Sequence, residues 1–131
     1  MRIISVVGAV IHRDGRILAA QRKIGSKLGG MWEFPGGKIE PNESPKEALR
    51  REIQEELEAE IEIGDQICTA THHYDFATIQ LTTFSCILSS DSLVLNDHDE
   101  TRWLLPGELD TVNWAPADIP TIKLLKDEAV T

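Results

Sequence analysis

The 131-residue sequence has few cysteines, no long apolar run and little positive charge, and each shortage argues against a class of protein. Cys68 and Cys86 lie far apart and lack the spacing to other Cys or His residues that zinc sites show. We expect both to be buried, reduced thiols. The apolar start, residues 1–11, is too short to cross a bilayer and lacks the cleavage pattern of a signal peptide. It predicts the first strand of a cytoplasmic protein with no membrane partner.

Acidic residues outnumber basic ones by 22 to 13, which gives a formal net charge of -9. A nucleic-acid polymer is bound through a basic stripe, so no such partner is expected. A small nucleotide that arrives with its metal ion remains compatible with this charge. The length suits a single domain over residues 1–131, and no repeat or low-complexity linker divides it. The oligomeric state is left open between monomer and homodimer.

Short β-like runs and two helical patterns are distributed along the chain. Residues 3–12 and 16–21 flank an Arg13-Asp14-Gly15 turn signal and predict a hairpin. Further strands are expected at residues 32–34, 78–88 and 101–105 and from residue 59, helices from Pro45 and at 118–126, and one helical turn at 106–109. Mixed strands with two helices predict an α+β fold.

A helix that carries several glutamates follows a Pro35-Gly36-Gly37 turn. Ser44 and Pro45, with Glu47 three residues after the serine, form a capping-box pattern that predicts a helix start at about Pro45. At 100° per residue the apolar side chains share one stripe, and three acids share an adjoining arc. These acids are Glu52, Glu55 and Glu56.

Three carboxylates on one arc repel one another, by roughly 3 kcal/mol for a pair about 5 Å apart at an effective dielectric of 20. Arg51 can orient some of these acids but cannot neutralise all of them. A hard divalent cation with oxygen ligands suits the arc, and Mg²⁺ is preferred with Mn²⁺ as the alternative. Taken alone, the glutamates are more typical of a solvated helix surface.

The segment resembles the Nudix box, G-x5-E-x7-R-E-U-x-E-E-x-G-U, in which U is an aliphatic residue. The matching residues are Gly37, Glu43, Arg51, Glu52, Ile53, Glu55 and Glu56. At average residue usage, such a coincidence anywhere in the chain is on the order of one in a million. Two positions depart from the pattern, because Glu58 replaces the last glycine and Ala59 the final aliphatic residue. Glu58 must therefore avoid a left-handed conformation or bear its strain.

We identify the chain as a member of the Nudix hydrolases, and this resemblance implies a mixed sheet between helices in an α/β/α arrangement. It also implies that Glu52, Glu55 and Glu56 hold Mg²⁺ or Mn²⁺. Of these, Glu52 is our choice for the base that takes a proton from the attacking water. Glu43 and Arg51 are expected to pair and to orient these acids.

Three further segments resemble the MutT-like branch, whose members hydrolyse nucleoside triphosphates to the monophosphate and pyrophosphate by attack at the β-phosphorus. The run Glu33-Phe34-Pro35-Gly36-Gly37-Lys38 matches the branch's EFPGGK, which implies a Gly36 carbonyl on the metal and Lys38 near phosphate. Residues 97–103 resemble E-H-x4-W, whose Glu lies near the metals. The corresponding Asp97 is a candidate metal ligand, and a solvated turn acid is the alternative.

The third segment, residues 114–120, is similar to the WxPAD-x-P stretch of relatives that act on cytidine or oxidised purine nucleotides. Its Asp118 could accept a hydrogen bond from an exocyclic amine of the base, with a plain helix cap as the alternative. Tyr74 falls where the branch has an aromatic over the base, and Phe34 is a further candidate contact. Core packing is the alternative for both aromatic residues.

Arg22 matches an arginine that contacts phosphate or sugar in the branch, whereas Ala77 replaces a further arginine that follows the aromatic residue. The implied function is metal-dependent hydrolysis of 8-oxo-dGTP, dCTP or CTP, which would sanitise the nucleotide pool and so assist DNA repair. One alternative is a Nudix hydrolase of ADP-ribose, a nucleotide sugar or a dinucleoside polyphosphate. Another is a non-catalytic nucleotide-binding module. The sequence does not choose between the bases.

Overall fold

The computed structural model describes residues 2–130 as one mixed β-sheet with two α-helices. The elements are β1 (Ile3–Arg13), β2 (Arg16–Arg22), β3 (Trp32–Glu33), β4 (Gly36–Lys38), α1 (Pro45–Leu57), β5 (Ile61–His73), β6 (Thr78–Leu88), β7 (His98–Leu104), the 3-10 turns η1 (Pro106–Thr111) and η2 (Pro116–Asp118), and α2 (Ile119–Val130). None of the helices over these residues is long and apolar enough to cross a membrane.

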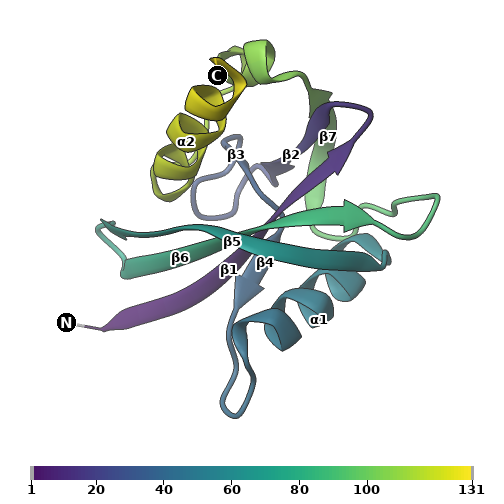
Figure 1. The fold of residues 1–131 in the computed structure, drawn as a ribbon. Coiled ribbons are helices and arrows are strands. Elements are labelled where there is room, and N and C mark those ends of the chain that lie inside the picture. The colour runs from purple at the N-terminus through teal and green to yellow at the C-terminus, as the bar shows by residue number, and fades with distance from the viewer. Residues whose placement is uncertain (1, 131) are drawn as a thin grey trace.

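Strand β1 lies at the centre of the sheet and pairs in parallel with β6 but antiparallel with β2 and β4. The main strand order is β3-β2-β1-β6-β5, and β7 pairs with β2 outside this path. Helix α1 covers one face of the sheet and α2 covers the other (Figure 1). The predicted α+β fold, with a mixed sheet between helices, is therefore confirmed.

Alternation along β1 assigns its side chains to the two faces. Val7, Ala9 and Ile11 pack in the core cluster under α1, whereas Val10 belongs to the cluster on the α2 side. Such a two-residue period is the ordinary consequence of a pleated strand. Because helices cover β1 on both faces, its side chains are apolar on both faces. This explains the unbroken apolar run at the start of the sequence.

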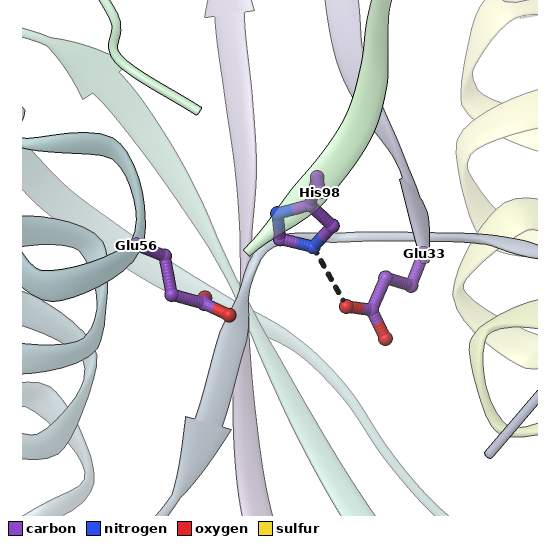
Figure 2. Close-up of side chains that lie close together, drawn as sticks. All are labelled: Glu33, Glu56 and His98. Atoms are coloured by element: carbon purple, nitrogen blue, oxygen red, sulfur yellow. Dashed lines mark hydrogen bonds and ion pairs between the residues drawn. The ribbon is translucent and has the colours of Figure 1, made fainter. Parts of the chain in front are cut away.

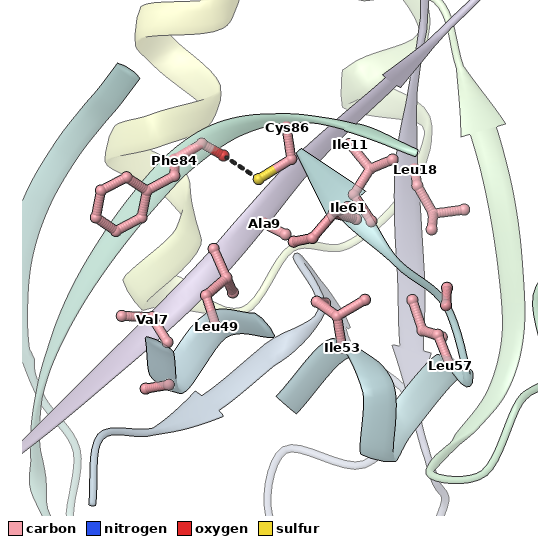
Figure 3. Packing of buried hydrophobic residues seen from close by; sticks show 12 residues of the cluster. Val7, Ala9, Ile11, Leu18, Leu49, Ile53, Leu57, Ile61, Phe84 and Cys86 are labelled. Carbon is pink, nitrogen blue, oxygen red and sulfur yellow. Dashed lines mark hydrogen bonds between the residues drawn. The ribbon is translucent and has the colours of Figure 1, made fainter. Parts of the chain in front are cut away.

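The apolar stripe of α1 fixes that helix against the sheet. Leu49, Ile53 and Leu57 are fully buried against β1 (Figure 3). Each contributes about 1.5 to 3 kcal/mol relative to an exposed side chain. The helix also begins as predicted: Ser44 Oγ accepts from the Glu47 N–H at 3.1 Å, and the Glu47 carboxylate accepts from the Ser44 N–H at 2.9 Å. The packing and the cap together determine which side of α1 carries the glutamates.

The predicted hairpin at the start of the chain is confirmed. Strands β1 and β2 are antiparallel, with Arg13 opposite Arg16. The two turn residues, Asp14 and Gly15, have φ values of 51° and 75°. Positive φ at both central positions is the geometry that two-residue hairpins favour, because it matches the right-handed twist of the strands.

Several boundaries differ from the predicted ones. Strand β5 extends to His73, β7 begins at His98 rather than at residue 101, and α2 begins at Ile119 after a 3-10 turn. Two register shifts against β6, between Ile63 and Cys68, interrupt the alternation of buried and exposed residues in β5, and the alternation resumes from Cys68 to His73. Cys86 is buried as expected, but Cys68 on this strand is only half-buried.

The exit of α1 shows the effect of the two departures from the box pattern. Glu58 adopts the left-handed conformation, with φ 48° and ψ 44°, and its N–H donates to the Gln54 carbonyl. Ala59 is buried, so a small side chain replaces the aliphatic one in the core. The helix therefore ends as a glycine would end it, and Glu58 bears the strain.

Candidate active site

Arg51 connects the loop before α1 with the acids on the helix. Its Nε donates to Glu43 Oε2 at 2.7 Å and its Nη2 to Glu43 Oε1 at 2.9 Å, while its Nη1 donates to Glu52 Oε1 at 2.7 Å. Nη2 also reaches the Lys38 carbonyl at 3.0 Å. The hydrogen bonds to Arg51 lower the pKa of Glu43 to about 2. The structure thus brings together Glu43 and Arg51, the pair that was expected to orient the other acids.

The three glutamates of the arc occupy three different environments. Glu56 is buried, Glu52 is half-buried, and Glu55 is exposed. Burial first, and then the neighbouring carboxylates of Glu33 and Glu52, raise the pKa of Glu56 to about 9. Burial also raises the pKa of Glu52 above its usual value, although Arg51 opposes this. A positive charge nearby would stabilise the ionised forms of these two desolvated carboxylates.

Side chains from two strands lie close to Glu56. Donor atoms of Glu33, Glu56 and His98 lie within 4.8 Å of one another, and they come from β3, α1 and β7 respectively (Figure 2). His98 Nε2 lies 2.9 Å from Glu33 Oε2 in a hydrogen bond. The other ring nitrogen, His98 Nδ1, is buried and has no hydrogen-bond partner within residues 2–130.

Strand pairing explains why Glu33 and His98 meet. Strand β2 lies between β3 and β7, and its Ala20 pairs with Glu33 while its Arg22 pairs with His98. Sequence reasoning assigned no role to Glu33 or His98. Both lie inside segments that resemble the MutT-like branch, EFPGGK and residues 97–103. Their place in these segments was the sequence signal that could have identified them.

Two glycines form the floor beside the acids. The Gly36 N–H donates to Glu56 Oε1 at 2.9 Å, and β4 pairs Gly36 with Gly8 of β1. A Cβ at Gly36 would collide with the Val7 backbone, and a Cβ at Gly37 would collide with the Glu52 carboxylate. The paired glycines therefore allow the sheet and the carboxylates to approach closely.

Asp97 stands directly before β7 and is exposed. Its charge is one of those that raise the pKa of Glu56, so the two carboxylates lie within electrostatic range. Over residues 2–130, the three-residue group of possible metal donors includes Glu33, Glu56 and His98, and not Asp97. The structure thus places Asp97 at the rim of the acidic cluster.

A cavity of about 680 Å³ extends from this cluster across the sheet. Its volume falls within the usual range of small-molecule pockets. Glu33, Gly36 and Glu56 line one part of it. All five residues predicted to contact substrate also line it: Arg22, Phe34, Lys38, Tyr74 and Asp118.

Asp118 lies in the η2 turn and is 5% exposed. Its Oδ1 accepts a hydrogen bond from the Phe34 N–H at 3.1 Å, which is a contact between distant parts of the chain. Burial raises the pKa of Asp118 well above its usual value. This hydrogen bond connects the turn before α2 to the residue after β3, which is a contact beyond that of a plain helix cap.

The two candidate aromatic residues are held by packing. Phe34 is 3% exposed, and its ring centroid lies 4.9 Å from that of Trp114 in the core on the α2 side. The Tyr74 hydroxyl accepts from the Ala117 N–H at 2.9 Å, and its ring stacks on Phe76 with centroids 5.0 Å apart. Core packing therefore accounts for most of the Phe34 surface, although both rings also line the cavity.

Two of the basic residues that line the cavity, Arg22 and Lys27, lie at the loop after β2. Arg22 Nη1 donates to Glu33 Oε1 at 2.9 Å, and Arg22 Nε donates to the Lys27 carbonyl at 2.7 Å. Lys27 Nζ lies 4.6 Å from the centre of the Phe76 ring, beside Ala77. Lys27, which the sequence analysis did not single out, thus adds a positive charge to the cavity over the ring of the residue that precedes Ala77.

The donor chemistry of the site fits a hard divalent cation. The carboxylates of Glu52 and Glu56 are both desolvated, and the charge of Glu52 helps to raise the pKa of Glu56, so a cation would offset this repulsion. In the same region, His98 Nδ1 is a buried polar atom without a hydrogen-bond partner among the residues that the structure describes. Oxygen ligands favour Mg²⁺, and a nearby imidazole is also compatible with Mn²⁺.

Comparison with known proteins agrees with this geometry. The family model of the NUDIX domain matches residues 6–124. The CTP pyrophosphohydrolase of Escherichia coli K12 is 39% identical over 123 residues, which cover 94% of this chain and 91% of that protein. The 8-oxo-dGTP diphosphatase of Proteus vulgaris is 39% identical over 77 residues, covering 59% of this chain and 69% of that protein.

Solved structures give the same result. The MutT protein of methicillin-resistant Staphylococcus aureus 252 is 47% identical with a TM-score of 0.80, covering 97% of this chain and 98% of that one. The E. coli ORF135 protein is 37% identical with a TM-score of 0.84, covering 98% and 92%. A helix with the complete set of box acids, folded as in these structures, shows that the chain belongs to the Nudix hydrolase family.

Proposed function

We propose that the protein hydrolyses (deoxy)nucleoside triphosphates to the monophosphate and pyrophosphate, with Mg²⁺ or Mn²⁺ as cofactor. The observation that carries this proposal is the continuity of one cavity from Glu56 to Asp118. The acidic end suits a triphosphate that arrives with its cations. The other end, with Phe34 and Asp118, suits a base. One nucleotide would occupy both ends at once.

When bound, a divalent cation would lower the pKa of water and neutralise charge on the phosphate oxygens. Glu52 and Glu56 would hold it, with Glu55, the Gly36 carbonyl and Asp97 as further ligands. Lys38 would contact a phosphate oxygen, because it follows the glycine turn and lines the same cavity.

Glu52 is the proposed proton acceptor for a water that attacks the β-phosphorus. Its side chain is half-buried, and the hydrogen bond from Arg51 at 2.7 Å fixes its orientation. Arg51 is in turn held by Glu43. This chain of contacts keeps the carboxylate of Glu52 in one position without filling both of its oxygens.

Asp118 is the proposed reader of the base. A buried carboxylate with a raised pKa is costly to keep ionised, and an amine N–H of a base would supply the donor that offsets this cost. Cytosine and guanine carry such an amine, whereas uracil and thymine do not. The relatives named above are a CTP pyrophosphohydrolase and an 8-oxo-dGTP diphosphatase, which makes CTP, dCTP and 8-oxo-dGTP the candidate substrates.

The test is a panel of ordinary and oxidised nucleoside triphosphates, compared by pyrophosphate release and kcat/KM in Mg²⁺. We expect release from at least one cytosine or oxidised guanine triphosphate, and loss of release when EDTA removes the metal. A second set of compounds in the same assay, the second arm, contains ADP-ribose, a nucleotide sugar and a dinucleoside polyphosphate.

If only compounds of the second arm are hydrolysed, the substrate is another diphosphate derivative and not a nucleoside triphosphate. Tight binding of a triphosphate without release of pyrophosphate would instead indicate a binding module. Attack at the β-phosphorus is checked separately: in ¹⁸O-labelled water the label should enter the pyrophosphate and not the nucleoside monophosphate.

A further inference from the structure

The C-terminal end of α1 is closed by a distant segment of the chain. The last turn of a helix leaves carbonyls without intrahelical partners. Here the Val94 N–H donates to the Leu57 carbonyl at 2.9 Å, and the Asn96 N–H donates to the Glu56 carbonyl at 3.0 Å. The Asn96 side chain completes the set, because its Nδ2 donates to the Glu55 carbonyl at 2.8 Å.

Asn96 also contacts the residue that departs from the box pattern. Its Nδ2 lies 3.1 Å from Glu58 Oε2, at the position where Glu58 takes the left-handed conformation in place of glycine. A non-glycine residue in this conformation is strained by about 1 kcal/mol or more. The side chain of Glu58 thus gains a hydrogen bond that glycine could not make.

The same residue is fixed on its other side to the loop after β2. Lys23 Nζ donates to the Asn96 carbonyl at 3.1 Å, and three residues further on Asp99 Oδ2 accepts from the Ile24 N–H at 3.1 Å. Residues 96–99 are therefore held between the end of α1 and this loop. Asp97 and His98 lie between these two attachments.

The two residues that follow Asn96 lie near the acidic cluster. His98 belongs to the group with Glu33 and Glu56 (Figure 2), and Asp97 lies within electrostatic range of Glu56. Strand β7 holds His98 through its pairing with β2, and the hydrogen bonds of Asn96 connect the start of this strand to the helix that carries the acids. A residue that makes such a connection acts on metal binding without being a ligand.

We propose that Asn96 is a positioning residue, which holds Asp97 and His98 beside Glu56 and so shapes the divalent-cation site. The proposal rests on the proposed metal-dependent function. It also gives a reason for asparagine at this position. Its amide donates to a carbonyl and a carboxylate together, whereas an aspartate would place a third negative group beside Glu58 and the negative end of the helix.

The test measures binding of Mn²⁺ alone, by the EPR signal of the free ion, to the metal-free protein. We expect Asn96→Ala to weaken Mn²⁺ binding by about tenfold, the lower end of the effect of residues that orient metal ligands. Asn96→Asp should weaken it at least as much. Ile122→Val serves as the control, because it removes one buried methylene from the core on the opposite face of the sheet and should leave Mn²⁺ binding unchanged.

A double variant separates positioning from helix stability. Glu58→Gly relieves the left-handed strain, so Asn96→Ala/Glu58→Gly should regain part of the urea midpoint lost in Asn96→Ala but not its Mn²⁺ affinity. Recovery of both would overturn the proposal, as would wild-type Mn²⁺ binding by Asn96→Ala. Equal weakening by Ile122→Val would also overturn it.

Activity then distinguishes this proposal from the proposed function. Raising Mg²⁺ at saturating triphosphate should restore most of the kcat of Asn96→Ala, because the defect is in metal binding. A wild-type protein that binds Mn²⁺ but releases no pyrophosphate from any triphosphate would refute the proposed function, and the Mn²⁺ comparison would still decide the role of Asn96.

Discussion

Arg51 and Glu43 form a two-pronged ion pair, with hydrogen bonds of 2.7 Å and 2.9 Å between one guanidinium and both oxygens of one carboxylate. The pair joins the loop before α1 to the helix that carries the acids. Because the remaining Nη1 donates to Glu52, a single guanidinium connects the loop, the helix and the proposed catalytic base.

This pair makes stability depend on pH in a defined direction. Hydrogen bonds from Arg51 hold the pKa of Glu43 at about 2, below its usual value of 4.5. The folded state therefore binds this proton less readily than the unfolded state, and the pair's contribution is complete above pH 4.5 and is lost as pH falls toward 2. In EDTA, the urea midpoints of wild type and Glu43→Gln should differ at pH 6 and converge as the pH falls through this window.

Glu62→Gln is the matched control for this measurement, since it removes the same charge from an exposed position on β5. A Glu43→Gln difference that stays constant from pH 6 to pH 3 would show that the ion pair is not its source.

Glu52→Gln should keep the fold and lose most of kcat. The amide retains the size of the side chain but cannot accept a proton, and removal of a general base typically costs about 10²- to 10⁴-fold. Pyrophosphate release measures the loss, and circular dichroism with the urea midpoint checks the fold. Near-normal turnover would remove Glu52 from the role of base.

Neighbouring glycines should respond differently to alanine. A Cβ at Gly37 meets the end of the flexible Glu52 side chain, which can move aside, whereas a Cβ at Gly36 meets the backbone of Val7, which cannot. We expect Gly37→Ala to lower kcat with little change in the urea midpoint, because it displaces the proposed base. Gly36→Ala should be strongly destabilised. The opposite order of stabilities would contradict this account of the glycine turn.

The parts of the site that follow local rules could be predicted from the sequence. Capping and helical period fixed the start of α1 and the common arc of Glu52, Glu55 and Glu56, because both depend on residues within a few positions of each other. The graded burial of these three acids could not be predicted, since it depends on how α1 rotates against the sheet.

Contacts made by strand pairing were also beyond local rules. Glu33 and His98 meet only because β2 lies between β3 and β7. Asn96 is a similar case, as its partners Glu55 and Glu58 lie 41 and 38 residues away in the sequence. No periodicity in the sequence predicts contacts over such separations. Resemblance to the family did mark the segments that contain Glu33 and His98, but not Asn96.

Asp118→Asn should change the ranking of bases rather than the rate for every substrate. The carboxyl of Asp118 is buried and accepts from the Phe34 N–H, and asparagine can keep that hydrogen bond through its carbonyl oxygen. Its NH₂ group would then face the base as a donor where Asp118 offers an acceptor. Relative kcat/KM for amine-bearing bases over uracil and thymine should fall by about 1 to 3 kcal/mol, or roughly five- to 150-fold. The triphosphate panel measures this ratio for wild type and variant, with Asp110→Asn on the exposed η1 turn as control. An unchanged ranking would leave Asp118 with a purely structural role, that of holding η2 against Phe34.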